Sequence, residues 1–312
     1  MNHKLVDQKK EGELMNLAIG TDYEGRSKRI EDIEMCLREI AEAGFSHVHW
    51  CFEWTGDYIY SKAEMYQIRE WMEKYGLKAK SLHASKGSRC ESCDTKQKGH
   101  YRKDYTSDIE FNRIAGRELI ENRVELAHII GATEIVLHMY LPFLDFQDKP
   151  ETKEVFYRQA FRSLDELEPF CKERNVRICI ENLFEAPGEL QLEQFDLLFG
   201  RYSKEFLGFC LDTGHANLVW GDSFIEVLVE RYKDRLFSIH MHDNKGWGDE
   251  PGCGDAHRLP GEGTIDWKRL MGVLRTSAYE LPWTLEVGKP EEEEVAAYLK
   301  RAKEAGAWMD CQ

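Results

Sequence analysis

Short apolar runs alternate with longer amphipathic segments about eight times along this chain. The apolar runs are rich in Ile, Val, Leu and Phe and are bounded by turn residues, which is typical of buried strands. The segments between them carry helical periodicity, because apolar residues recur there at spacings of three and four. An example is the set Ile30, Ile33, Leu37 and Ile40. The pattern predicts strands at 15–20, 47–52, 78–84, 134–139, 177–182, 207–213, 236–243 and 282–288.

Several residues mark the expected ends of the helices. Gly44, Gly76 and Gly131 each fall between a helical segment and the next strand, where a left-handed residue ends a helix. Residues 223–226 (SFIE) have the spacing of a capping box that opens a helix. We expect the last helix to begin directly after Pro290, with four consecutive glutamates at the positive end of its dipole.

This order of elements predicts the fold class. Strands that alternate with helices imply parallel strands joined by right-handed crossovers. Eight such units favour an α/β architecture closed into a (β/α)8 TIM barrel over an open doubly wound sheet, and 312 residues suit a single barrel domain. No G-x-G-x-x-G or Walker sequence follows the first strand, so the dinucleotide-fold alternative lacks its signature. We expect residues 1–14 to form a flexible leader and residues 15–312 to form the barrel.

Residues 85–108 form one long irregular insertion after the third predicted strand, and Lys and Arg outnumber Asp and Glu within it. Loops that follow barrel strands lie on the catalytic face. Lys86 and Arg89 are therefore candidates to bind an anionic substrate. A solvated surface loop is the alternative interpretation.

Acidic or imidazole side chains lie at the ends of the last six predicted strands, which are otherwise apolar. They are His83, His138, Glu181, Asp212 with His215, His240 with His242, and Glu286. Carboxylates and imidazoles buried together are unfavourable without a counter-charge, because an unpaired buried ion costs several kcal/mol. We therefore predict a bound divalent cation. A donor set of oxygen and nitrogen without thiolate favours Mn²⁺, Co²⁺, Zn²⁺ or Mg²⁺.

The segments IENL, LDTGHANL, IHMHDNKG and GEGTIDW carry a resemblance to the superfamily of xylose-isomerase-like barrels over essentially the whole chain. That superfamily includes sugar and sugar phosphate isomerases and epimerases, inosose dehydratases and apurinic endonuclease family 2. The resemblance implies that one divalent ion is held by Glu181, Asp212, His240 and Glu286, with His242 as the reserve ligand. It also implies that Glu181 and Glu286 shuttle a proton through an enediolate, next to a metal-bound carbonyl. His215 is implied to touch the substrate or a second metal.

Aromatic residues near the end of the second predicted strand are candidates to pack against the apolar side of a sugar. They are Trp50 and Trp54, with Phe52 between them interpreted as a core residue.

The main alternative is a phosphodiesterase of the apurinic endonuclease type, which acts on abasic DNA with three Zn²⁺ and nine ligands. The matching residues are His83, His138, Glu181, Asp212, His215, His240, Asp255, His257 and Glu286. A formal net charge of −15 disfavours a nucleic-acid partner at long range. A metal-dependent dehydratase or lyase is a third option. A non-enzymatic sugar-binding protein would be expected to lack some of the four core ligands, and all four are present.

The sequence also suggests where the protein acts. No apolar run approaches the roughly 18 residues of a membrane span, and the start of the chain lacks the apolar centre of a secretory signal. Nine cysteines without an export signal favour reduced thiols. We expect a cytoplasmic enzyme with a small carbohydrate substrate and no membrane partner. Because barrels of this superfamily often pair, a homo-oligomer is an open expectation.

Overall fold

The computed structural model describes residues 15–24, 30–85 and 103–312. The predicted leader and most of the predicted basic insertion, including Lys86 and Arg89, lie outside these residues. Each of the eight predicted strands is present, with ends that differ by up to three residues. They are β1 (Met15–Gly20), β2 (Phe45–Trp50), β3 (Lys78–Ser85), β4 (Glu134–Leu137), β5 (Arg177–Glu181), β6 (Leu207–Asp212), β7 (Leu236–His240) and β8 (Trp283–Leu285).

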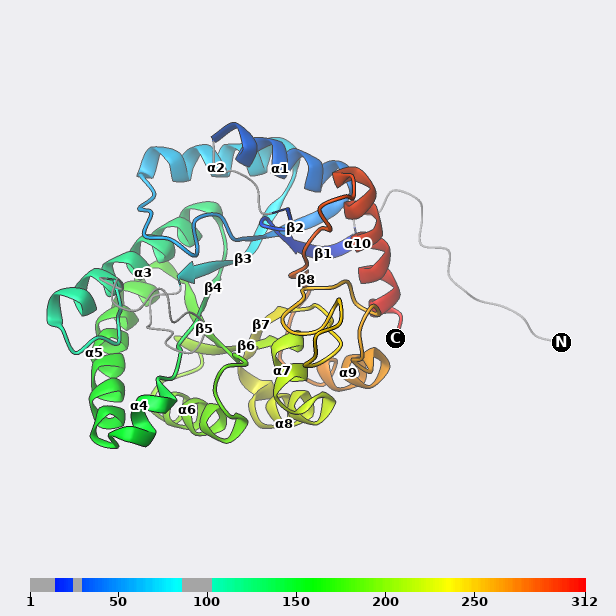
Figure 1. The fold of residues 1–312 in the computed structure, drawn as a ribbon. Coiled ribbons are helices and arrows are strands. Elements are labelled where there is room, and N and C mark those ends of the chain that lie inside the picture. The colour runs from blue at the N-terminus through cyan, green and yellow to red at the C-terminus, as the bar shows by residue number, and fades with distance from the viewer. Residues whose placement is uncertain (1–14, 25–29, 86–102) are drawn as a thin grey trace.

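The strands form one parallel sheet in the order β7-β6-β5-β4-β3-β2-β1-β8. Hydrogen bonds just beyond β7 join its two edges: the Met241 amide donates to the Thr284 carbonyl at 2.9 Å, and the Glu286 amide donates to the Met241 carbonyl at 3.3 Å. The sheet therefore closes on itself, and the predicted (β/α)8 barrel is confirmed (Figure 1).

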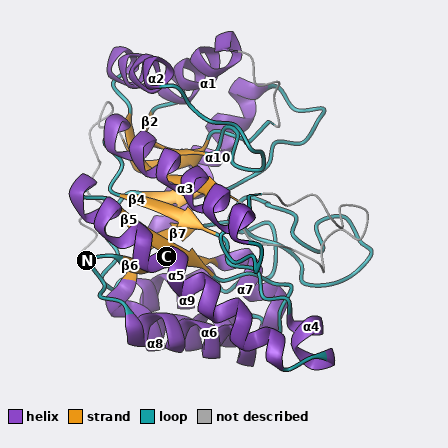
Figure 2. Cartoon of the chain, turned by 90° about the vertical axis from the view of Figure 1, so that its left-hand side faces the viewer, coloured by secondary structure: helices purple, strands orange, loops and turns teal. Residues whose placement is uncertain are grey.

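Helices surround the strands in an outer layer (Figures 1 and 2). None of the helices in the described ranges is long and apolar enough to cross a bilayer. The helices are α1 (Ile30–Glu42), α2 (Lys62–Tyr75), α3 (Glu110–Ile130), α4 (Phe143–Asp148), α5 (Glu151–Arg174), α6 (Gly188–Arg201), α7 (Thr213–Trp220), α8 (Asp222–Tyr232), the short η1 (Lys233–Arg235), α9 (Trp267–Leu274) and α10 (Val295–Asp310).

The predicted helix ends are correct in three places and wrong in two. Gly44, Gly76 and Gly131 have φ values of 85°, 69° and 85°, as the left-handed ends of helices require. The capping box at 223–226 does not form. Its serine lies inside the first turn of α8 and donates its hydroxyl to the Trp220 carbonyl at 2.7 Å, because α7 ends only two residues before α8 begins.

The last helix begins at Val295 and not directly after Pro290. The ammonium group of Lys289 explains the delay. It donates hydrogen bonds to the carbonyls of Pro290 and Glu293 at 2.9 and 2.7 Å. Residues 290–293 therefore wrap around the Lys289 ammonium group, and the helix begins only after them.

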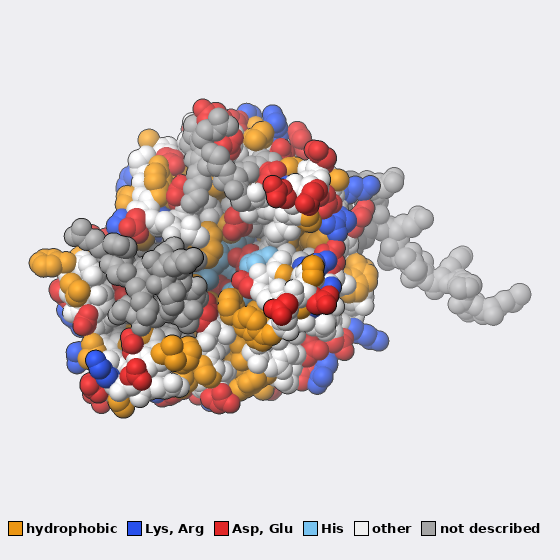
Figure 3. Space-filling model, in the orientation of Figure 1, with side chains coloured by type: hydrophobic (Ala, Val, Ile, Leu, Met, Phe, Trp, Pro, Cys, Tyr) orange, Lys and Arg blue, Asp and Glu red, His pale blue; other side chains and the backbone are white. Residues whose placement is uncertain are grey.

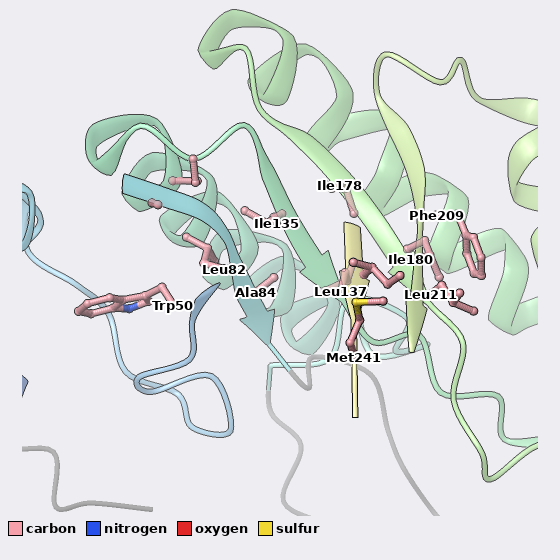
Figure 4. Packing of buried hydrophobic residues seen from close by; sticks show 14 of the residues in the cluster. Trp50, Leu82, Ala84, Ile135, Leu137, Ile178, Ile180, Phe209, Leu211 and Met241 are labelled. Atoms are coloured by element: carbon pink, nitrogen blue, oxygen red, sulfur yellow. The ribbon is translucent and has the colours of Figure 1, made fainter. Parts of the chain in front are cut away.

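Alternation along the strands separates an apolar layer from the polar interior of the barrel. Successive side chains point to opposite faces of a strand, so every second residue faces the helices. The outward residues belong to the large core between the sheet and the helices (Figure 4): Leu82, Ala84, Ile135, Leu137, Ile178, Ile180, Phe209 and Leu211. A separate cluster of Val136, Cys179 and Cys210 occupies alternate positions on β4, β5 and β6. Two residues further on, each of these strands reaches a predicted site residue: His138, Glu181 and Asp212.

A close contact between α3 and the segment before it supports one of these site residues. The Tyr105 hydroxyl donates to the His138 carbonyl at 2.7 Å, and the Ser163 hydroxyl donates to the Tyr105 carbonyl at 2.6 Å. Gly116 of α3 lies against this segment, where a Cβ would fall 2.3 Å from the Tyr105 backbone nitrogen and 2.6 Å from the Asp104 carbonyl carbon. The absence of a side chain at Gly116 lets the segment reach His138.

We expect Gly116→Ala to lower the free energy of unfolding by about 1–3 kcal/mol, because backbone has to move to admit the methyl group. Gly272→Ala in α9 is the matched control, since a Cβ there meets nothing within 4 Å. The control should leave stability unchanged or raise it by up to about 1 kcal/mol. Denaturant unfolding measures both variants, and equal stabilities would contradict the close approach.

Candidate active site

Most of the predicted site residues converge at the C-terminal ends of the strands. Figure 3 shows a hollow at the centre of this face, with histidine side chains at its bottom. Potential ligand atoms lie within 4.8 Å of one another in several overlapping groups. Three of these groups matter here: Glu181, Asp212, His240 and Glu286; His83, His138 and Glu181; and His215, His242, Asp255 and His257.

The first group, which we call the central quartet, consists of the four core ligands implied by the sequence. The His240 Nδ1 atom lies 3.1 Å from Glu286 Oε2, 3.4 Å from Glu181 Oε2 and 4.0 Å from Asp212 Oδ2. The strand register explains this arrangement, because Asp212 on β6 pairs directly with His240 on β7. Of the two histidines considered for this position, the geometry brings His240 into the quartet. His242 lies beside it, with Nε2 3.0 Å from both Asp212 oxygens.

Two further histidines orient the glutamates of the quartet. His83 Nε2 lies 2.9 Å from Glu286 Oε1, and His138 Nε2 lies 3.0 Å from Glu181 Oε2. The other ring nitrogen of His138 lies 3.0 Å from the Tyr140 hydroxyl. Glu286, which follows β8, is thus held by His83 of β3. Glu181 of β5 is held by His138, which follows the neighbouring strand β4.

His215, His242, Asp255 and His257 form a second cluster beside the quartet. Asp255 Oδ1 lies 3.2 Å from His257 Nε2 and 3.5 Å from His215 Nε2, and the His242 and His257 rings stack at 4.1 Å. Burial lowers the pKa of His257, but the Asp255 carboxylate outweighs it and raises that pKa to about 10. The cluster meets the quartet through His215, whose Nδ1 is 3.2 Å from Glu181 Oε1.

The electrostatics of the quartet suit a cation. Burial raises the pKa of the Glu181 and Glu286 carboxyls, yet the nearby histidines hold both pKa values well below the usual range. Burial lowers the pKa of His240, but its anionic surroundings raise that pKa well above the usual range. Neither ring nitrogen of His240 nor Glu181 Oε1 has a well-aligned hydrogen-bond partner, although His240 Nδ1 lies 3.1 Å from Glu286 Oε2 and Glu181 Oε1 lies 3.2 Å from His215 Nδ1. Ionised carboxylates beside an unsatisfied imidazole fit a divalent ion in place of the His240 proton.

His49 is a buried neighbour of the quartet that sequence reasoning missed. Its side chain is 0% exposed, its Nδ1 lies 2.7 Å from the Ser81 hydroxyl, and its ring centre is 4.6 Å from that of His240. Burial holds the pKa of His49 well below its usual value. The alternation His47-Val48-His49 along the second strand was a signal that could have identified it.

The two tryptophans proposed to contact substrate take different positions. Trp54 stacks on the His83 ring at 4.2 Å with an interplanar angle of 16°, so it borders the site. Trp50 is 0% exposed in the outer core, and its indole donates to the Tyr60 hydroxyl at 3.1 Å (Figure 4). Because His49 faces the barrel interior, its neighbour Trp50 faces the helices. The structure does not support substrate contact by Trp50.

The GEGTIDW segment contributes structure to the site rather than ligands. The Asp243 carboxylate accepts hydrogen bonds from the Gly261 amide at 3.0 Å and from the Trp267 indole at 2.8 Å. A Cβ on Gly263 would lie 2.1 Å from Asp243 Oδ1. This clamp fixes both ends of the loop that carries Asp255 and His257.

Comparison with known proteins agrees with this architecture. "Uncharacterized protein y4fM" of Sinorhizobium fredii (strain NBRC 101917 / NGR234) is 34% identical over 262 residues, which cover 82% of this chain and 81% of that protein. The crystal structure of D-psicose 3-epimerase in the presence of D-fructose matches with a TM-score of 0.67 and 18% identity, over 94% of this chain and 98% of that one. The IOLI protein with a bound zinc atom matches with a TM-score of 0.67 and 14% identity, over 95% and 98%.

At these identities the likeness to the solved structures shows the fold. The family is shown by sequence, because the model of the xylose isomerase-like TIM barrel matches residues 37–309. The chain therefore belongs to the family of xylose isomerase-like TIM barrels.

Proposed function

We propose that this protein is a divalent-metal-dependent sugar isomerase or epimerase that moves a proton at the carbon next to a carbonyl, through an enediolate. The observation that carries the proposal is the central quartet. It places two ionised glutamates, Glu181 and Glu286, on either side of His240 at 3.4 and 3.1 Å. The solved neighbours, which include a sugar 3-epimerase and a zinc-binding protein, are consistent with it.

The two glutamates are placed to exchange a proton with a substrate held between them. Glu181 ends β5 and Glu286 follows β8, so they reach the barrel mouth from different sides. One carboxylate takes the proton from the carbon, and the other returns a proton to the same or the neighbouring carbon. The histidines that hold them, His138 and His83, keep each carboxylate in a fixed orientation.

The remaining ligands complete the binding site. Asp212 and His240 would hold the metal together with the two glutamates, and the orphaned ring nitrogens of His240 favour this assignment. A bound divalent ion supplies a Lewis acid that stabilises negative charge on a substrate oxygen. Trp54, stacked on His83, borders the space for the sugar.

A second candidate is a phosphodiesterase of the apurinic endonuclease type. It is favoured by one observation: the nine residues matched in the sequence fall into three adjoining groups of potential ligands. The charge of the chain opposes it, because −15 repels a polyanionic duplex. In the described part of the chain, Figure 3 shows acidic and basic side chains interspersed around the hollow, with no continuous basic surface.

We expect the purified protein to hold about one divalent ion per chain, and His240→Ala to lose it. The loss in metal affinity should exceed the roughly 10–100-fold that is typical when a residue hydrogen-bonded to a metal ligand is changed. His128→Ala is the control, since this histidine is exposed on α3 and contacts the Arg174 carbonyl. Elemental analysis measures the content. In thermal unfolding, metal at 100 times its Kd should stabilise the wild type by about 2.7 kcal/mol.

We expect Glu181→Gln and Glu286→Gln each to slow exchange of the substrate carbon-bound proton in D2O by about 10²–10⁴-fold, because amides cannot accept that proton. Exchange is followed by NMR across a panel of ketoses, with metal content and unfolding measured in the same samples. Glu304→Gln, an exposed glutamate on α10, serves as the control. Exchange at the wild-type rate in either active-site variant would remove the proton-shuttle assignment.

We expect no cleavage of an abasic-site DNA duplex by the Zn²⁺-loaded protein above the rate seen with Zn²⁺ alone, because the acidic chain repels the duplex. Gel electrophoresis of labelled duplex measures cleavage at low and physiological salt. Cleavage that disappears in Asp255→Ala, together with three ions per chain, would favour the phosphodiesterase instead.

A further inference from the structure

An exposed tryptophan stands on the catalytic face next to the second cluster. Trp247, in the loop after β7, is 65% exposed. Large apolar side chains held in water at the edge of a cavity are characteristic of binding surfaces. Figure 3 shows hydrophobic side chains on the rim of the hollow that contains the histidines.

Trp247 is anchored by hydrogen bonds despite its exposure. Its indole nitrogen donates to the Leu218 carbonyl of α7 at 2.8 Å. The backbone of its loop is braced by hydrogen bonds from the Lys245 amide to the Gly252 carbonyl, at 2.8 Å, and from the Gly254 amide to the Gly246 carbonyl, at 2.9 Å. A fixed aromatic ring loses little conformational entropy when a ligand stacks on it.

A second aromatic ring connects Trp247 to the proposed metal site. The Phe184 ring lies 5.8 Å from the Trp247 ring and 5.1 Å from the His215 ring, with His215 itself 3.2 Å from Glu181. We call Phe184 and Trp247 the aromatic ledge. Both residues of the ledge contact α7, because Phe184 packs on His215 and Trp247 bonds to Leu218, and both of these partners belong to that helix. The ledge is therefore fixed relative to the quartet.

The ledge extends the aromatic rings beyond the residues that contact the quartet. Trp54 on His83 and Phe184 beside His215 border the space around the quartet. A monosaccharide reacting between Glu181 and Glu286 would lie next to Trp54 and His215, whereas Trp247 connects to His215 through Phe184, whose ring centre is 5.8 Å from that of Trp247. The apolar faces of pyranose rings stack on flat aromatic rings, and an exposed indole offers such a face.

We propose that the aromatic ledge is a subsite for a second sugar ring, so that the substrate is a glycosylated keto sugar rather than a free ketose. This inference rests on the proposed isomerase or epimerase function. The keto sugar lies over the quartet, and the glycosidic partner stacks on Trp247.

The test compares the Mn²⁺-loaded protein with D-fructose and with four glycosyl-fructoses, namely turanose, maltulose, isomaltulose and lactulose, by titration calorimetry. We expect the wild type to bind at least one disaccharide about ten-fold more tightly than D-fructose. Trp247→Ala should reduce this advantage to within about two-fold without changing D-fructose affinity, whereas Trp247→Phe should retain part of it. Trp308→Ala, at an exposed tryptophan of α10, should behave as the wild type.

The proposal is overturned if no disaccharide binds more tightly than D-fructose, or if Trp247→Ala leaves the advantage intact. Proton exchange in D2O with the same sugars keeps the two proposals separate. If exchange is absent while the Trp247-dependent preference persists, the proposed reaction fails and the subsite stands. If exchange proceeds on D-fructose while the preference is absent, the reaction stands and the subsite fails.

Discussion

Three carboxylates and several imidazoles share the mouth of this barrel, largely shielded from water and within contact distance of one another. Charges in such a place cost several kcal/mol each unless they are compensated. Burial lowers the pKa of His240, but Cys210, Glu286 and Glu181 around the ring together raise that pKa well above its usual value. A divalent ion at the same point would satisfy all these groups at once. The arrangement of the strand ends depends on this compensation.

The strands that carry these charges have an apolar outer face and place the charged groups on the inner face. Outward residues such as Leu137, Ile180 and Leu211 join the large core beneath the helices. Their neighbours on the same strands, Glu181 and Asp212, face inward at the end of the sheet. Because alternation has a period of two, the apolar contacts that fix each strand's register also fix which residues reach the site. A shift by one residue would bury the ligands under the helices.

The loops after β6 and β7 give the site its asymmetry. Asp212 caps α7 by accepting the His215 amide at 2.6 Å, so the same carboxylate belongs to the quartet and starts the helix that carries His215. The Asp243 clamp then holds the loop that brings Asp255 and His257 beside them. These loops thereby add His215, Asp255 and His257 to His49 and His83, which lie next to the quartet on their own strands. Within a shared fold, such loop differences are where substrate choice is made.

The sequence by itself determined the eight strands, the closure of the barrel and the four residues of the quartet. The strands and the closure follow from local periodicity and from the rule that parallel strands end on one face, whereas the four residues are what the family resemblance implies. Sequence reasoning failed where a side chain's neighbours come from distant segments. It assigned Trp50 to the substrate and overlooked His49, because the direction of each side chain depends on how β2 packs between the barrel interior and the helices. It also expected a cap from Ser223, whose hydroxyl bonds instead to the end of the preceding helix. What only the tertiary structure decided is the geometry of the quartet, in which His240 lies beside both glutamates while His242 lies beside Asp212. Both histidines lie at the end of the same strand, and the positions of Glu181 and Glu286 across the barrel distinguish them.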